Sequence, residues 1–120
     1  MRSRSVKRKT RARKAGGAKS PRLPKDAVML TVILHAREGR GPLLEAELRA
    51  LVAPTLREEG CLRYDLHRGA DQPESFLLHE VWASRDHHTK HTRTAHFLHW
   101  NARKDTLVQS RESAFWKQIQ

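Results

Sequence analysis

The chain has 120 residues and a formal net charge of +11 at pH 7, a size that allows one small domain with or without a tail. Its single cysteine, Cys61, excludes an internal disulfide and a cysteine-based zinc or iron–sulfur site. The sequence also lacks an apolar run near the roughly 20 residues of a membrane helix, a secretory signal and a glycine-rich nucleotide-binding motif. These exclusions favour a small cytoplasmic protein that binds no nucleotide cofactor.

The positive charge is concentrated at the N-terminus. Residues 1–25 contain 11 of the 24 Lys and Arg residues and none of the 13 Asp and Glu residues, so residues 26–120 are electrically balanced. Because residues 1–27 show no hydrophobic periodicity, we predict a disordered basic tail, which is either an idle solvated segment or a weak contact to nucleic-acid phosphates without sequence preference. Two alternatives are an organelle transit peptide and translation that starts at Met29, directly before the first predicted strand. The folded domain is predicted over residues 28–120.

Hydrophobic patterning predicts strands and helices over this domain. Residues 28–36 are apolar at nearly every position, which is typical of a strand covered on both faces. Residues 42–58 place leucines at helical spacing, with Pro42 in the first turn and Gly60 ending the helix. The pattern then predicts strands at 61–68 and 75–82, short helices at 84–92 and 95–104, and a final strand at 112–119.

This order of elements predicts an α+β fold: a ferredoxin-like antiparallel sheet of four strands with helices on one face. The strands at 28–36 and 75–82 are apolar on both faces, but the helices can cover only one of them. We therefore expect a homodimer in which two sheets pack face to face as a dimeric α+β barrel, which also enlarges a small core.

Four segments resemble the antibiotic biosynthesis monooxygenase family: MLTVILHAR at 29–37, EEGCLRYDLHR at 58–68, FLLHEVW at 76–82 and HTRTAHF at 91–97. The resemblance covers about residues 29–100 and implies small dimeric α+β-barrel proteins with a ferredoxin-like protomer. It also implies a monooxygenase that oxidises an aromatic phenol or hydroquinone to a quinone with dioxygen and needs no cofactor. Since relatives include isomerases and proteins without a known reaction, an isomerase and a small-molecule binding or stress-response module stay open as alternatives.

The resemblance also suggests the site residues. A family oxygenase needs an apolar pocket, a base that ionises the phenol and a donor that stabilises the oxyanion. We predict His91 and His96 as candidates for the base, because an unperturbed imidazole titrates near pH 6.5. We predict Glu80 as a partner for a histidine or a substrate hydroxyl, because a carboxylate in mid-strand is costly unless paired. The predicted pocket walls are His35, Leu62, Tyr64, Leu66, Phe76, Leu78, Trp82 and Phe97.

Each of these residues also has a purely structural interpretation. Histidines on short helices are commonly solvated, Glu80 could be a buried ion-pair partner, and Tyr64 could be a core tyrosine. His87 and His91 have the spacing of a helical ligand pair, but a lone pair without a following glutamate is a weak signal, so no metal site is predicted.

Overall fold

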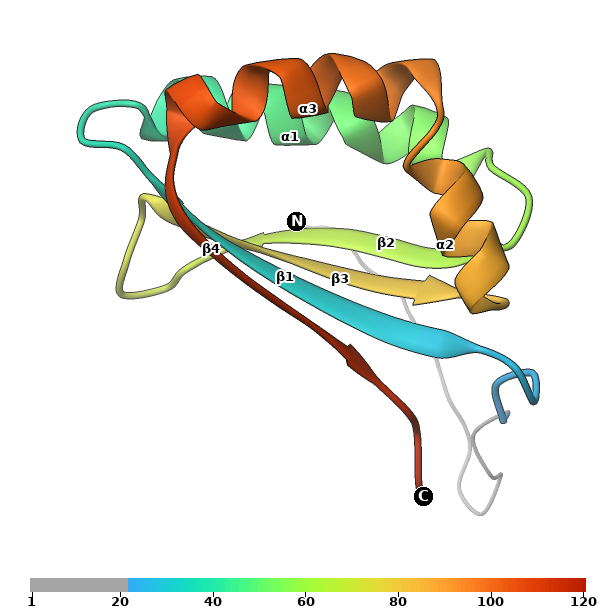
Figure 1. Cartoon of the computed structure of the whole chain (residues 1–120). Helices are drawn as coiled ribbons and strands as arrows, with labels where there is room; N and C mark the ends of the chain where they lie inside the picture. Colours follow the sequence, from blue (N-terminus) through green and yellow to red (C-terminus); the bar gives the residue numbers. More distant parts are fainter. Residues whose placement is uncertain (1–21) are drawn as a thin grey trace, which may run out of the picture.

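The computed structural model describes residues 22–120, so most of the predicted tail, with its expected nucleic-acid contact, lies outside the described residues. The elements in chain order are β1 (Val28–Ala36), α1 (Gly41–Leu56), β2 (Cys61–Arg68), β3 (Ser75–Trp82), α2 (Arg85–His91), α3 (Ala95–Leu107) and β4 (Val108–Trp116). The strands form one antiparallel sheet in the order β2-β3-β1-β4, and the helices lie on one of its faces (Figure 1). The predicted α+β ferredoxin-like fold is therefore confirmed.

The core lies between this sheet and the helical layer, in which α1 and α3 pack side by side. Every second residue of β1 and β3 faces the helices, where it meets the leucine stripe of α1. Burying a side chain of leucine size contributes about 1.5–3 kcal/mol, so this layer accounts for much of the stability of a small domain. The buried positions of these three elements include Leu30, Val32, Leu34, Leu44, Leu48, Leu51, Phe76, Leu78 and Trp82.

Local signals fix where the helices begin and end. Ser84 caps α2 by accepting a hydrogen bond from the backbone N–H of His87, and Thr94 caps α3 in the same way through Phe97. Gly60, in the turn after α1, has a φ of +83°, and a Cβ there would lie 2.2 Å from the His87 ring. Glycine is therefore required at this turn both by conformation and by space.

The junction of α3 with β4 and the register of β2 differ from the sequence prediction. β4 begins at Val108, not at residue 112, because α3 runs to Leu107 and the strand follows it without a loop. The first half of β4 is polar and exposed, so its pairing with β1, and not its hydrophobicity, makes it a strand. In β2 the register shifts between Cys61 and Arg63, which leaves Leu62 47% exposed.

The sheet face away from the helices stays uncovered within residues 22–120 (Figure 1). Met29, Ile33 and Leu77 lie on this face half-buried, and Trp116 is 52% exposed at its edge. The homodimer expected from this face stays a prediction. In this part of the chain, no helix combines the length and the apolar character that a membrane span requires.

Candidate active site

A cavity of about 240 Å³ lies between the sheet and the helices α2 and α3. Its floor is apolar, since it is formed by inward-facing residues of β1 and β3 and by rings from the helices and β4. Typical ligand pockets have roughly 300–1,000 Å³, so this cavity suits a small ligand. The apolar lining residues are Leu30, Val32, Leu34, Leu78, Phe97, Trp100 and Phe115.

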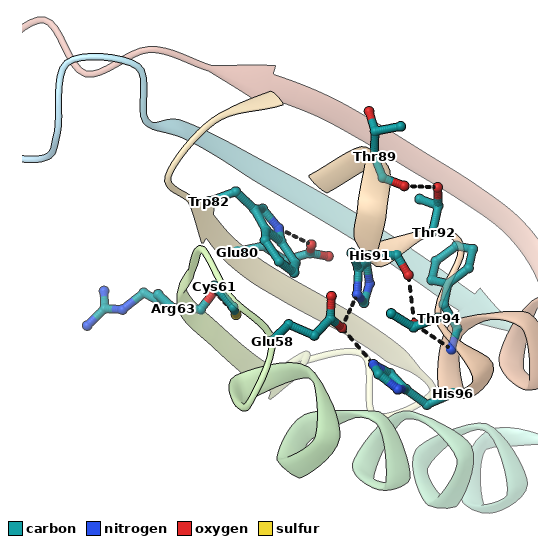
Figure 2. A network of polar contacts seen from close by, with 11 residues as sticks. Glu58, Cys61, Arg63, Glu80, Trp82, Thr89, His91, Thr92, Thr94 and His96 are labelled. Carbon is teal, nitrogen blue, oxygen red and sulfur yellow. Dashed lines mark hydrogen bonds and ion pairs between the residues drawn. The ribbon is translucent and has the colours of Figure 1, made fainter. Parts of the chain in front are cut away.

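A carboxylate and two histidines form a hydrogen-bonded cluster beside this cavity (Figure 2). Glu58 Oε2 lies 2.7 Å from His91 Nδ1 and 2.6 Å from His96 Nε2. The three residues come from separate segments: the turn after α1, the last residue of α2 and the first turn of α3. His91 is 1% exposed, and its ring packs near Trp82 and Phe97 at centroid distances of 4.8 and 5.0 Å.

The cluster fixes the protonation pattern of His91. An ionised carboxylate can only accept hydrogen bonds, so both histidines donate to Glu58 and a neutral His91 carries its proton on Nδ1. Burial lowers the pKa of His91, and this effect outweighs the opposing influence of the Glu58 carboxylate. His91 also lines the cavity, and Nε2 is the ring nitrogen left for a ligand there. A neutral histidine with a free Nε2 is the form that can accept a proton.

Two further polar groups share the cavity with His91. Glu80 is 3% exposed, and its Oε1 accepts a hydrogen bond of 2.9 Å from the indole Nε1–H of Trp82. Burial raises the pKa of Glu80 to about 7, and the nearby Glu58 carboxylate adds to the rise. Tyr64 pairs with Glu80 across β2 and β3, and burial raises the pKa of its hydroxyl, so it stays a neutral donor.

The structure brings together only part of the predicted site. His91, Glu80, Tyr64, Leu78 and Phe97 line the cavity. His96 lies behind His91 and contacts it through Glu58, and Trp82 supports Glu80 from the core.

Four predicted wall residues lie elsewhere. His35 points to the sheet face away from the helices, where its Nδ1 lies 2.7 Å from Ser75 Oγ. Leu62 is exposed at the β2 bulge. Leu66 and Phe76 line a separate groove between α1 and β2. None of these four lines the cavity that contains His91, and their contact with a substrate stays a prediction. The pattern of β1, apolar on both faces, does not reveal that His35 points away from the helices, and the bulge takes Leu62 out of the alternation of β2.

Sequence reasoning missed Glu58, the residue that joins the two histidines. It stands in a turn, 33 positions before His91, and no periodicity connects the two. The motif EEGC that contains it was the only available signal. Four further cavity residues were not predicted from the sequence: His88, Asn101, Lys104 and Arg111.

The same cluster offers the best set of metal ligands within residues 22–120. Glu58 Oε2, His91 Nδ1 and His96 Nε2 all lie within 4.8 Å of one another. Two histidines and a carboxylate suit zinc or ferrous iron, but the histidine protons would first have to leave. His87, the other half of the helical histidine pair, does not join them, because its Nδ1 lies 2.8 Å from Ser84 Oγ.

Comparison with known proteins finds one matching family profile and a relative of similar sequence. Residues 27–103 match the profile of the family described as "Antibiotic biosynthesis monooxygenase". The protein Rv0793 of Mycobacterium tuberculosis, whose name provisionally describes it as a monooxygenase, is 37% identical over 65 residues. That match covers 54% of this chain and 63% of Rv0793, so the chain spans less than two thirds of this relative.

Solved structures extend the similarity to nearly the whole described chain. The crystal structure of PA3566 from Pseudomonas aeruginosa is 32% identical, with a TM-score of 0.78, and the alignment covers 80% of this chain and 97% of that one. The structure of Rv0793 is 26% identical, with a TM-score of 0.75 and coverages of 79% and 97%. Because the profile match spans more than half of the chain, this chain belongs to the antibiotic biosynthesis monooxygenase family.

Proposed function

We propose that this protein is a cofactor-independent monooxygenase that oxidises a small aromatic phenol or hydroquinone to a quinone with dioxygen. The observation that carries the proposal is His91, which lines an apolar cavity while Glu58 holds its other ring nitrogen at 2.7 Å. Family membership supports monooxygenase chemistry in general, and the apolar and aromatic lining of the cavity supports a flat aromatic substrate.

The first step is a proton transfer. His91 Nε2 accepts the phenol proton, and the resulting imidazolium is stabilised by the Glu58 carboxylate at Nδ1. His96 donates to the same carboxylate oxygen and so keeps it directed at His91. The developing phenolate lies where the hydroxyl of Tyr64 and a protonated Glu80 can donate to it.

Oxidation then uses electrons of the substrate itself. The phenolate passes one electron to dioxygen, and the radical pair joins at the para carbon. The resulting peroxide anion takes back the proton held by His91, and the hydroperoxide then loses water as the ring C–H bond and the O–O bond break, so one oxygen atom enters the quinone and the other leaves in water. A hydroquinone instead gives up two electrons and two protons and dioxygen is reduced to hydrogen peroxide, so with this substrate the protein acts as an oxidase and no oxygen atom enters the quinone.

We also propose that the working form is a homodimer. The uncovered sheet face carries Ile33, Leu77 and Trp116, and covering it with a second sheet removes apolar surface from water. A charge at its centre opposes that packing, so Ile33→Asp is expected to yield monomers in sedimentation while the parent sediments as a dimer. An Ile33→Asp protein that stays dimeric would place the interface elsewhere.

The chemical proposal is tested by dioxygen uptake. Full-length protein treated with a chelator is mixed with 1-naphthol or 1,4-dihydroxynaphthalene, and uptake is compared with autoxidation. We expect dioxygen uptake that survives chelation. With 1-naphthol, adding catalase is expected to return no oxygen, because the proposed reaction forms water and no hydrogen peroxide. His91→Ala is expected to lose the uptake, whereas His99→Ala, a change at a histidine with 69% of its side chain exposed, keeps it.

Absence of uptake above autoxidation overturns the oxygenase proposal. If a ligand then raises the melting temperature without turnover, the binding module is favoured. If a ligand exchanges a ring or side-chain proton with solvent in a His91-dependent manner, the isomerase is favoured, because His91 and Glu80 supply a base and an acid in one cavity.

A further inference from the structure

The cavity has two chemically different ends. His91, Glu80 and Tyr64 lie at one end, where β1 Leu30 pairs with Glu80 on one side and with Phe115 on the other. Four residues further along β1, Leu34 pairs with Arg111 of β4, so Arg111 lies at the opposite end. At about 3.3 Å per residue, these two rows of the sheet are about 13 Å apart.

The far end is positively charged. Arg111 of β4 and Lys104 of α3 both line the cavity there, and the only carboxylate in the lining is Glu80 at the other end. Lys104 is half-buried, and its Nζ donates to Asn101 Oδ1 at 2.9 Å. Among residues 22–120, neither cation forms an ion pair with a carboxylate, whereas the neighbouring Arg103 is paired with Glu47.

Lys104 is half-buried and Arg111 is exposed beside this apolar lining, so both cations can reach an anionic group on a ligand in the cavity. Arginine binds carboxylate, sulfonate and phosphate groups through two parallel hydrogen bonds, and lysine adds a point charge. No carboxylate within residues 22–120 pairs with either cation, so a ligand that fills the cavity is the natural source of an anionic group.

We infer that the substrate is an aromatic acid: a fused-ring phenol whose hydroxyl lies at His91 and whose anionic group, on the opposite end of the ring system, binds Lys104 and Arg111. This inference rests on the proposed function for the placement of the hydroxyl. Its structural basis is the span between the two ends of the cavity, which two fused rings and the long cationic side chains together can bridge. The small volume of the cavity favours two rings over larger polycyclic ligands.

Three matched probes test the inference by equilibrium binding under nitrogen, so that no turnover is needed. 6-Hydroxy-2-naphthoate carries its two groups at opposite ends, 3-hydroxy-2-naphthoate carries them side by side, and 2-naphthol has no acid. Binding to the full-length protein is followed by calorimetry and by tryptophan fluorescence, to which Trp100 in the cavity lining contributes. 6-Hydroxynaphthalene-2-sulfonate, compared with the carboxylate, distinguishes a tetrahedral from a planar anion.

We expect 6-hydroxy-2-naphthoate to bind roughly tenfold to a hundredfold more tightly than 2-naphthol, the range typical of hydrogen bonds to charged groups. The preference weakens as salt is added, because both cations lie near the surface. Lys104→Met combined with Arg111→Met is expected to remove the preference for 6-hydroxy-2-naphthoate over 2-naphthol. Lys90→Met combined with Arg93→Met makes the same change in charge at exposed positions outside the cavity lining and keeps it.

Equal binding of 6-hydroxy-2-naphthoate and 2-naphthol, failure of all the probes to bind, or a preference that persists in the Lys104 and Arg111 double variant overturns the inference. A preference for 3-hydroxy-2-naphthoate does so too, since it contradicts the two-ended arrangement. These outcomes are separable from the proposed function. Oxygen uptake with uncharged naphthols but no acid preference leaves the oxygenase and removes only the acid site.

Discussion

Glu58→Gln is the substitution that tests the organisation of the site most directly. Glu58 Oε2 accepts hydrogen bonds from both His91 and His96, and its side chain is 12% exposed. Glutamine has nearly the same shape, and its one amide oxygen can accept both hydrogen bonds, but that oxygen carries no charge. A hydrogen bond to a charged group contributes about 1.5–3 kcal/mol and a neutral one about 0.5–1.5 kcal/mol, so weakening both is expected to lower the free energy of unfolding by about 1–3 kcal/mol.

The effect on the reaction is larger than the effect on stability. Without the carboxylate, the imidazolium formed at His91 loses its counter-charge and the ring loses its fixed tautomer. General-base catalysis contributes about 10²–10⁴-fold, so we expect the turnover rate to fall at least about a hundredfold. The carboxylate is the influence that raises the pKa of His91, so the acidic limb of the pH–rate profile moves to lower pH when it is removed.

The assay is dioxygen uptake measured from pH 4.5 to 8, together with urea unfolding of the same samples. Glu59→Gln is the matched control, because Glu59 is the adjacent glutamate in the same turn and is exposed. A Glu58→Gln protein that keeps the wild-type rate and the wild-type acidic limb refutes the role of this carboxylate. Circular dichroism at the assay temperature distinguishes a loss of activity from a loss of fold.

Three further predictions concern individual groups. Glu80 binds its proton more tightly in the folded protein, so the free energy of unfolding falls as pH rises from about 4.5 to about 7. Glu80→Gln removes this loss, so the variant is expected to be more stable than the parent by about 1–3 kcal/mol at pH 8 but not at pH 4.5. Urea unfolding midpoints at the two pH values measure the difference. Gly60→Ala places a Cβ against His87 at a φ of +83° and is expected to lower the melting temperature by several degrees, whereas Gly39→Ala, at a φ of +75° with no atom within 4 Å, carries only the conformational cost. Zinc at micromolar concentration is expected to inhibit by replacing the protons between Glu58 and the two histidines, and a chelator is expected to restore activity; inhibition that is unchanged in His96→Ala would place the zinc elsewhere.

Much of the fold could be predicted from sequence, because its signals are local. The first three strands and α1 follow from hydrophobic spacing, and Ser84 marks the start of α2 by its capping chemistry. β4 could be predicted only in part, since its first residues are polar and become a strand by pairing with β1. The uncertainty there is physical, because an exposed edge strand needs no apolar pattern.

The site could be predicted less well, because it depends on distances between segments. His91, Glu80 and Tyr64 follow from residue type and family resemblance. Glu58 joins His91 only after α1 and α2 are in place, and no pattern in the sequence measures that distance. The direction of His35 could not be predicted for a related reason: a strand that is apolar on both faces carries no record of which face the helices cover.

The direct passage from α3 into β4 has a consequence for how ligand preference can change in such a protein. Residues 27–103 match the family profile, and this stretch contains Glu58, His91 and His96. Lys104 and the inward-facing residues of β4 come just after it. The Glu58, His91 and His96 cluster and the cations at the far end of the cavity, Lys104 and Arg111, therefore lie in separate segments of the chain. Substitutions confined to this C-terminal segment would change the residues at that end of the cavity while leaving the Glu58, His91 and His96 cluster unaltered.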